Sequence, residues 1–353
     1  MECRYLAAYK VQGFSNTPEH PDVPLLNLEG HKVKATLTGD TDRHCYVLDR
    51  QIALHWLSTG QVGAENSSDE NFGERLNETI REIRTNRDQR LTYKSSGALV
   101  MEFCDEIEAT LEGSDRDFGE FAVYFDAINM EEVKESFRNR AAALVASLAI
   151  SSSGQYAVER ITDGVYLVDS DGKVVYSFDA KDFEGTKGSI VHLTLGGLDL
   201  NSDYASALMN NREMRGVSTL LAYSLDVSTD RLRTFLFTWT ALEIFINKTF
   251  SGYEQKFAHE LTSKSTVPGA SRYLTRVKSV MKNKYNPVDK FSVIASLLSG
   301  ESSDEHIEQF KRIKGIRDRL VHTGKYEEDS LPNIELRELL IGYLRRHLHY
   351  ISQ

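Results

Sequence analysis

The chain has 353 residues, a formal net charge of −10 and 41% hydrophobic residues, which is an ordinary globular composition. It excludes collagen-like, low-complexity and wholly disordered classes. No stretch approaches eighteen consecutive apolar residues, and the first residues lack the basic and then apolar segments of a secretion signal. We therefore expect a cytoplasmic protein with no membrane contact.

The cysteines predict neither a disulfide framework nor a zinc site. Cys3, Cys45 and Cys104 are odd in number, far apart and never arranged as CxxC. The common signatures of nucleotide hydrolysis, dinucleotide binding and zinc peptidases do not occur either. We expect no cofactor and no metal.

Charge is unevenly distributed along the chain. Residues 229–353 hold 20 Lys and Arg against 15 Asp and Glu, a net charge of +5. The rest of the chain therefore carries −15. A polyanion would meet the C-terminal part first, because phosphate binding depends on local positive potential. A solvated helical surface would explain this mild excess equally well.

The N-terminal half mixes strand and helix patterns. Strands are expected at residues 23–28 and 32–37, helices at 46–59 and 75–90 with a polar loop between them, and an apolar stretch of either kind at 99–111. A longer helix at 129–150 has acidic residues in its first turn. The remaining expectations are β-rich runs at 156–161, 165–168 and 174–178, separated by hairpin turns at Asp163-Gly164 and at 170–172, then a strand at 189–195 and a helix at 203–211.

The pattern is helical from residue 230 to the end. Helices are expected at 231–250, 271–285, 290–298, 303–323 and 335–351, with Gly324 as a C-terminal cap. The segment 271–285 is basic and amphipathic. We therefore expect an α+β protein of two parts: an acidic N-terminal region of mixed α/β structure, 1–228, and an all-α bundle, 229–353.

One helix near the C-terminus combines groups suited to acid–base chemistry. Asp318 and His322 are four residues apart and share a helix face, whereas Arg317 and His322 are five apart and about 140° around the helix. Arg317 and His322 converge only if the helix bends. A histidine beside a phosphate-binding guanidinium is the minimal equipment for cleaving RNA. On spacing alone, a salt-bridged solvated face is the commoner meaning.

Three further residues are weaker candidates for substrate binding. Lys314 and Arg319 lie around the motif and would contact a phosphate backbone, and Glu243 would pair with Arg317. Solvated surface charge is the competing interpretation of each. His347 and His349 are two residues apart and face different sides of a helix, which argues against a metal site.

Two segments together resemble the HEPN domain superfamily, especially its ApeA-like branch. They are RTFLFTWTALEIFI at 233–246 and IRDRLVHTG at 316–324. HEPN domains share a motif of Arg, a polar residue, a few further residues and His, which Arg317, Asp318 and His322 match. The resemblance covers about residues 229–353.

The resemblance implies a metal-independent endoribonuclease whose site forms where two HEPN domains pair, so that RNA and a second copy are the expected partners. His322 would transfer a proton during attack by the RNA 2′-hydroxyl, Arg317 would stabilise the phosphorane, and Asp318 would orient His322 or contact the ribose. Proteins of this build resemble prokaryotic antiviral defence and toxin proteins, whose N-terminal part senses a phage or cellular trigger or restrains the nuclease. The alternative is a dimerisation or RNA-binding module without catalysis.

Overall fold

The first strand of the chain lies inside a six-stranded antiparallel sheet. The computed structural model describes residues 2–11, 22–28, 32–59, 71–92, 97–106, 129–151, 158–182, 201–226, 229–281, 284–324, 327 and 330–352. The strand order is β2-β3-β4-β1-β5-β6, and each of these neighbouring pairs is antiparallel. The strands are β1 (Glu2–Val11), β2 (Val23–Leu28), β3 (Val33–Thr38), β4 (Gly97–Glu106), β5 (Val158–Val168) and β6 (Val174–Asp182).

The middle of the sheet is buried on both faces. In β1, Tyr5 and Ala7 point to one hydrophobic cluster, while Leu6 and Ala8 point to the other. A strand buried on both sides loses the alternation of apolar and polar residues that marks a half-exposed strand. The sequence analysis therefore did not identify β1, although it holds the sheet together by pairing with β4 and β5.

The expected hairpin turn at Asp163-Gly164 is wrong. Both residues lie within β5, opposite Leu6 and Ala7 of β1. A Cβ atom at Gly164 would lie 2.6 Å from Leu48 Cδ2 and 3.0 Å from Ala180 Cα. Glycine is needed here for close packing and not for a turn. The second expected turn is present, with Gly172 at φ 81° between β5 and β6.

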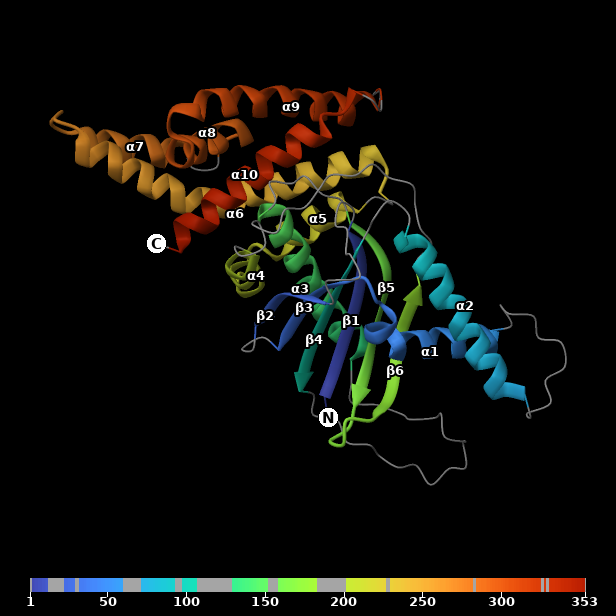
Figure 1. Ribbon diagram of the computed structural model, residues 1–353. Helices are drawn as coiled ribbons and strands as arrows, with labels where there is room; N and C mark the ends of the chain where they lie inside the picture. The colour runs from blue at the N-terminus through green and yellow to red at the C-terminus, as the bar shows by residue number, and fades with distance from the viewer. Residues whose placement is uncertain are drawn as a thin grey trace.

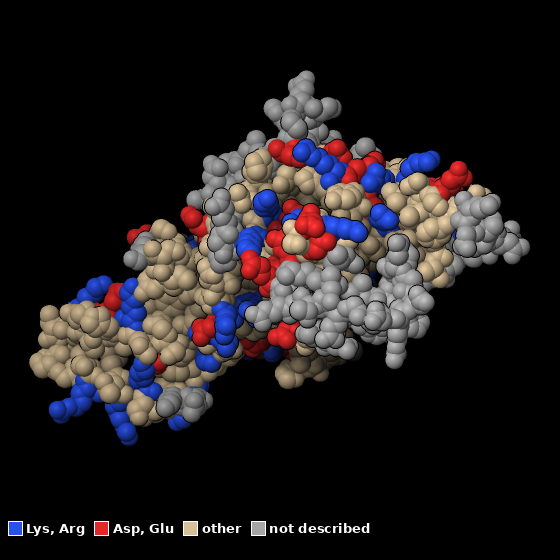
Figure 2. Space-filling view, turned by 90° about the horizontal axis from the view of Figure 1, so that it is seen from below, with Lys and Arg blue, Asp and Glu red and all other residues tan. Residues whose placement is uncertain are grey.

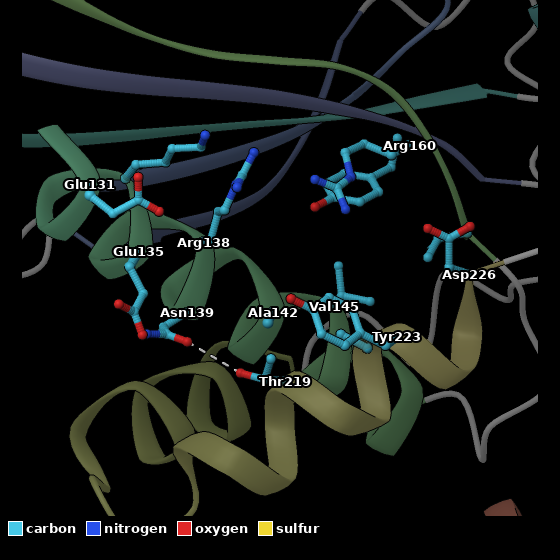
Figure 3. A pocket seen from close by; sticks show the side chains of 14 residues that line it. Glu131, Glu135, Arg138, Asn139, Ala142, Val145, Arg160, Thr219, Tyr223 and Asp226 are labelled. Atoms are coloured by element: carbon cyan, nitrogen blue, oxygen red, sulfur yellow. Dashed lines mark hydrogen bonds between the residues drawn. The ribbon is translucent and has the colours of Figure 1, made fainter. Parts of the chain in front are cut away.

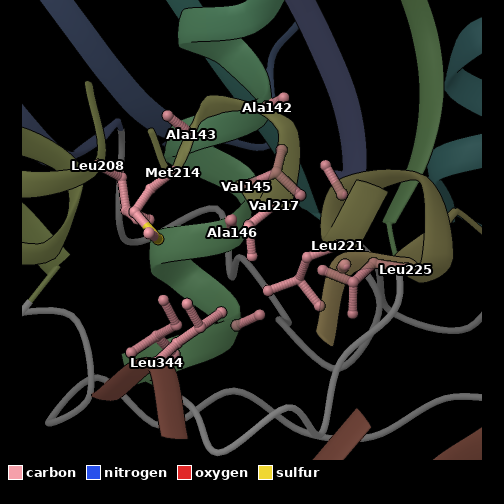
Figure 4. Packing of buried hydrophobic residues seen from close by; sticks show 14 of the residues in the cluster. Ala142, Ala143, Val145, Ala146, Leu208, Met214, Val217, Leu221, Leu225 and Leu344 are labelled. Atoms are coloured by element: carbon pink, nitrogen blue, oxygen red, sulfur yellow. The ribbon is translucent and has the colours of Figure 1, made fainter. Parts of the chain in front are cut away.

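Helices cover the two faces of the sheet. One face carries α1 (Asp42–Thr59) and α2 (Phe72–Thr92), and the other carries α3 (Met130–Ser151), α4 (Asn201–Asn210) and α5 (Arg215–Leu225) (Figure 1). The Ala-rich second half of α3 packs tightly against α4, α5 and the C-terminal helix (Figure 4). The helix α5 was not anticipated, and the expected strand at 189–195 lies outside the described residues.

The C-terminal helices agree closely with the expected ones. They are α6 (Arg231–Lys264), α7 (Ala270–Met281), α8 (Pro287–Leu298), α9 (Ser303–Thr323) and α10 (Asn333–Ile351). The main difference is α6, which continues fourteen residues beyond the expected end at 250. Its second half and α7 project away from the rest of the molecule (Figure 1). The α+β class is thus confirmed.

The sheet and the C-terminal helices share one buried hydrophobic cluster. It runs from Cys3 in β1 to Leu348 in α10, across the expected boundary at 228/229. Polar contacts join the same parts, because Arg345 donates to the carbonyl of Ile150 and Arg337 donates to that of Ser224 at 2.5 Å. The C-terminal helices therefore rest on α3 and α5. Within the part of the chain that the structure describes, no helix is both long and apolar enough to cross a membrane.

Candidate functional site

The predicted motif lies on α9, which is a continuous α-helix through Thr323. Gly324 ends it in the left-handed conformation (φ 63°), and its N–H donates to the carbonyl of Leu320. At the other end, His306 Nδ1 lies 3.1 Å from Ser299 Oγ and 3.1 Å from Tyr343 Oη. These contacts join α9 to the α8–α9 connection and to α10. The start of α9 is therefore held by contacts to its neighbours, and its end is capped by Gly324.

Arg317 is the centre of a cluster of charged side chains. Its guanidinium donates to Asp318 at 3.0 Å and to Glu243 of α6 at 3.5 Å. The same guanidinium lies 5.5 Å from the ring centroid of Trp239, a cation–π distance. The side chains of Arg317, Asp318 and Glu243 are each about 30% exposed. Of the two interpretations of Glu243, pairing with Arg317 and an unpaired surface position, the structure has the pairing.

Lys314 completes this cluster. It donates to Asp318 one helical turn away. Hydrogen bonds from Lys314 and Arg317 lower the pKa of the Asp318 carboxyl below its usual value. Two cations and two carboxylates therefore balance one another. A phosphate would bind here by displacing a carboxylate from Arg317, because a guanidinium offers the same donor fork to either anion.

His322 lies apart from this cluster. It is exposed in the last turn of α9, and among the described residues it has no hydrogen-bond or ion-pair partner. The hydrogen bond that His322 could donate to Asp318 is not formed, and the Asp318 carboxylate accepts from Lys314 and Arg317 instead. Since α9 does not bend, Arg317 and His322 remain on different sides of it. Arg319 is also exposed.

The histidines of α10 form no metal site. His347 is 8% exposed, and its Nδ1 lies 2.7 Å from the hydroxyl of Tyr253. Burial lowers the pKa of His347 to about 4, so this imidazole is neutral and part of the core. Nowhere in the described ranges do three or more His, Cys, Asp or Glu side chains gather as a metal would need.

A pocket that no sequence pattern indicated lies between α3, α5 and the sheet. Its cavity is about 260 Å³, and its lining includes Tyr9, Arg138, Arg160, Tyr223 and Asp226. Arg138 extends from α3 toward the sheet, which carries Arg160, while Thr219 of α5 bonds to Asn139 of α3 at 3.3 Å (Figure 3). Lining residues of both charges give the pocket no single ligand preference.

Buried charge lies next to this pocket. Asp163 is fully buried, accepts a hydrogen bond from Tyr5 at 2.9 Å and pairs with Arg160 at 3.2 Å and Arg138 at 3.6 Å. Burial raises the pKa of Tyr9 to about 12. The buried carboxylate of Asp163 is thus paired with one guanidinium from α3 and one from β5, as a buried charge requires. Reading Asp163 as a turn residue concealed this role.

Comparisons with protein-family models, curated proteins and solved structures find no match to this chain. The resemblance to HEPN domains therefore depends on the two sequence segments and on the helical surroundings of the motif.

Proposed function

We propose that the protein is a metal-independent endoribonuclease of HEPN type whose catalytic residues are Arg317 and His322. The observation that carries this proposal is that α9 presents both the Arg317 guanidinium and the His322 imidazole to solvent. Arg317 is partly exposed and oriented by Glu243, and His322 is exposed at the helix end. An oriented guanidinium and an accessible imidazole are the two functions that cleavage of RNA requires.

Two copies of α9 would supply the complete site. One His322 accepts the proton of the ribose 2′-hydroxyl, whose oxygen forms a bond to the adjacent phosphorus. Arg317 stabilises the charge on the phosphorane. The bond from phosphorus to the 5′-oxygen then breaks, and His322 of the partner subunit donates a proton to that oxygen. The products are a 2′,3′-cyclic phosphate and a 5′-hydroxyl, so DNA is not a substrate.

An exposed apolar residue supports pairing through this end of α9. Val321, the neighbour of His322, is 61% exposed, and Ile334 at the start of α10 is 72% exposed. A second copy would remove such side chains from water, which is favourable. Arg317 and His322 lie on different sides of one helix. Pairing across a two-fold axis would still bring the two kinds of group together, since each site would contain residues from both copies.

A second function is favoured by the charge balance of the cluster. Because Glu243 and Asp318 already neutralise Arg317 and Lys314, the motif can also be an ion-paired element of a non-catalytic dimerisation or RNA-binding module. A role in prokaryotic antiviral defence, with the N-terminal region responding to a phage or cellular trigger, remains part of the proposal and depends on the resemblance.

Cleavage of RNA by purified protein tests the proposal. We expect His322→Ala and Arg317→Ala each to lower the cleavage rate at least about 100-fold. We expect product ends with a cyclic phosphate, no effect of a metal chelator, and no cleavage of DNA of the same sequence. His259→Ala and Arg212→Ala, which change exposed residues elsewhere, are the matched controls. Equal cleavage by the motif and control variants would contradict the proposal, and RNA binding without cleavage would favour the second function.

A further inference from the structure

The end of α6 and the whole of α7 form a projecting basic arm, defined here as residues 261–281. The arm has four Lys and Arg and no Asp or Glu. One of the four, Lys264, pairs with Glu260 of α6 at 3.3 Å. No residue of α7 is buried. Lys and Arg side chains project from the left-hand end of the molecule, where Figure 1 places the arm (Figure 2). An acid-free helix standing away from an acidic protein concentrates positive potential.

Only part of α7 is occupied by packing on α6. Lys278 pairs with Glu254 of α6 at 3.3 Å, and Leu274, Val277 and Met281 are partly covered. The other side of α7 carries Arg272, Tyr273, Arg276 and Val280. Tyr273 is 69% exposed and Val280 is 45% exposed.

The exposed side of α7 alternates cations with an aromatic ring. Arg272 and Arg276 are four residues apart and therefore neighbours on one helix face, and Tyr273 lies three residues before Arg276. In the part of the chain that the structure describes, these three side chains have no hydrogen-bond or ion-pair partner. Unlike Arg317, they are available to a ligand without displacing a carboxylate.

We infer that the basic arm binds single-stranded RNA, with Arg272 and Arg276 on the phosphates and Tyr273 stacked on an unpaired base. Positive grooves with exposed aromatic rings are the means by which proteins hold single strands without sequence preference. This inference deepens the proposed function, on which the choice of RNA rests. The arm would hold substrate on the same bundle that carries Arg317 and His322.

Two other occupants fit the arm less well. A second copy pairing arm to arm would bring like charges together, which is unfavourable. A lipid surface needs a continuous apolar face, but Leu274, Val277 and Met281 are partly covered by α6. The exposed large apolar residues of the arm come from three segments and are interspersed with cations; they are Leu261, Val267, Tyr273 and Val280. The charge and the free aromatic ring favour RNA.

Fluorescence anisotropy with a labelled single-stranded RNA tests the arm, using the full chain with His322→Ala to prevent cleavage. We expect Arg272→Ala/Arg276→Ala to weaken binding at least about tenfold and to reduce the slope of log affinity against log salt by about 1.4, as two lost phosphate contacts require. Tyr273→Ala should weaken binding about tenfold, while Tyr273→Phe keeps the stacking and the affinity. Arg50→Ala/Arg81→Ala removes the same charge from exposed sites on α1 and α2 and should have little effect.

A dinucleotide substrate separates this inference from the proposed function. In the chain with His322 intact, arm variants should cleave a dinucleotide normally, because it is too short to reach the arm. If the arm variants bound long RNA with unchanged affinity, RNA binding by the arm would be disproved, while the proposed nuclease activity would not be affected. If binding depended on the arm but neither the long RNA nor the dinucleotide were cleaved, RNA binding by the arm would be supported and the proposed nuclease activity would be disproved. Binding to vesicles of phosphatidylserine and phosphatidylcholine but not to RNA would also overturn the inference.

Discussion

The guanidinium of Arg317 lies 3.5 Å from the carboxylate of Glu243, which precedes it by 74 residues. The contact joins α9 to α6, and it shows that the conspicuous arginine of the motif is already held by an acidic partner. Such a partner both orients the guanidinium and competes with any phosphate. The two effects can be separated by changing the charge of Glu243 without changing its shape.

The first prediction concerns this competition. Glu243→Gln keeps a hydrogen-bond acceptor beside Arg317 and removes the negative charge, so we expect RNA affinity to rise about threefold in a His322→Ala background. Filter binding or anisotropy would measure it. Glu308→Gln makes the same charge change at an exposed site on α9 and should have a smaller effect. Weaker binding by Glu243→Gln would mean that Glu243 acts mainly by positioning Arg317.

A second prediction concerns the expected dimer. Val321→Asp places a charge beside His322, where the proposed second copy would bury it, so we expect the dissociation constant of the dimer to rise at least about tenfold. Sedimentation velocity over a concentration series would measure this change. Val267→Asp, at a valine that is 66% exposed, is the matched control. An unchanged dimer would place the interface elsewhere, and a monomer at every concentration would remove the basis for a shared site.

The third prediction concerns the glycine inside β5. Gly164→Ala brings a Cβ atom against Leu48 and against the backbone of Ala180, so we expect a loss of about 1–3 kcal/mol in the free energy of unfolding. Gly73→Ala in α2 meets nothing within 4 Å and should stabilise the protein slightly. Urea unfolding of both variants would measure the difference. Equal stability of the two would mean that β5 and α1 adjust without strain.

A fourth prediction follows from the buried His347. Its folded pKa of about 4 lies below its ordinary value of 6.5, so the unfolded chain takes up a proton as pH falls through 6.5 while the folded protein stays neutral until about pH 4. Stability is therefore lost as pH falls across this window. We expect the wild type to lose about 2 kcal/mol more than His347→Gln between pH 7 and pH 5.

Urea unfolding at the two pH values would measure the contribution of His347. His259→Gln, which changes an exposed histidine on α6, should behave as the wild type. If His347→Gln lost as much stability in acid as the wild type, His347 would not be the group that titrates.

The C-terminal helices were predictable because their signals are local. The wide apolar stripe of α6 and Gly324 as a cap each lie within one short segment. The capping box of Asn286 and Asp289 was not used for the prediction, and α8 begins at Pro287 instead of the expected 290. The sheet was harder, because its central strand carries the continuous apolar pattern of an element buried on both faces. Lys10 of β1 and Glu159 of β5 lie opposite each other in the strand register, and both are buried. Because they are far apart in sequence, no local pattern predicts that they meet.

The candidate site was predictable only in part. The four-residue spacing of Asp318 and His322 allowed a hydrogen bond between them. Lys314 is also four residues from Asp318, and it is Lys314 that donates to the carboxylate. The pairing of Glu243 with Arg317 was one of two interpretations of Glu243, and the sequence favoured the other, an unpaired position on the helix surface. The pocket beside Arg138 and Arg160 could not be foreseen, since its walls come from four elements, β1, α3, β5 and α5, whose positions in space follow from the strand order of the sheet.

The helix α3 has the sheet on one side and the C-terminal helices on another, and its Ala-rich segment contacts both through small side chains. Small residues bring backbones close, so a shift of α3 is passed on to α10 rather than absorbed by flexible side chains. Cutting the chain between α5 and α6 and separating the two fragments would expose buried apolar side chains on both of them. The C-terminal helices therefore do not form a separate unit that could be exchanged among proteins, because they share their buried cluster with the sheet.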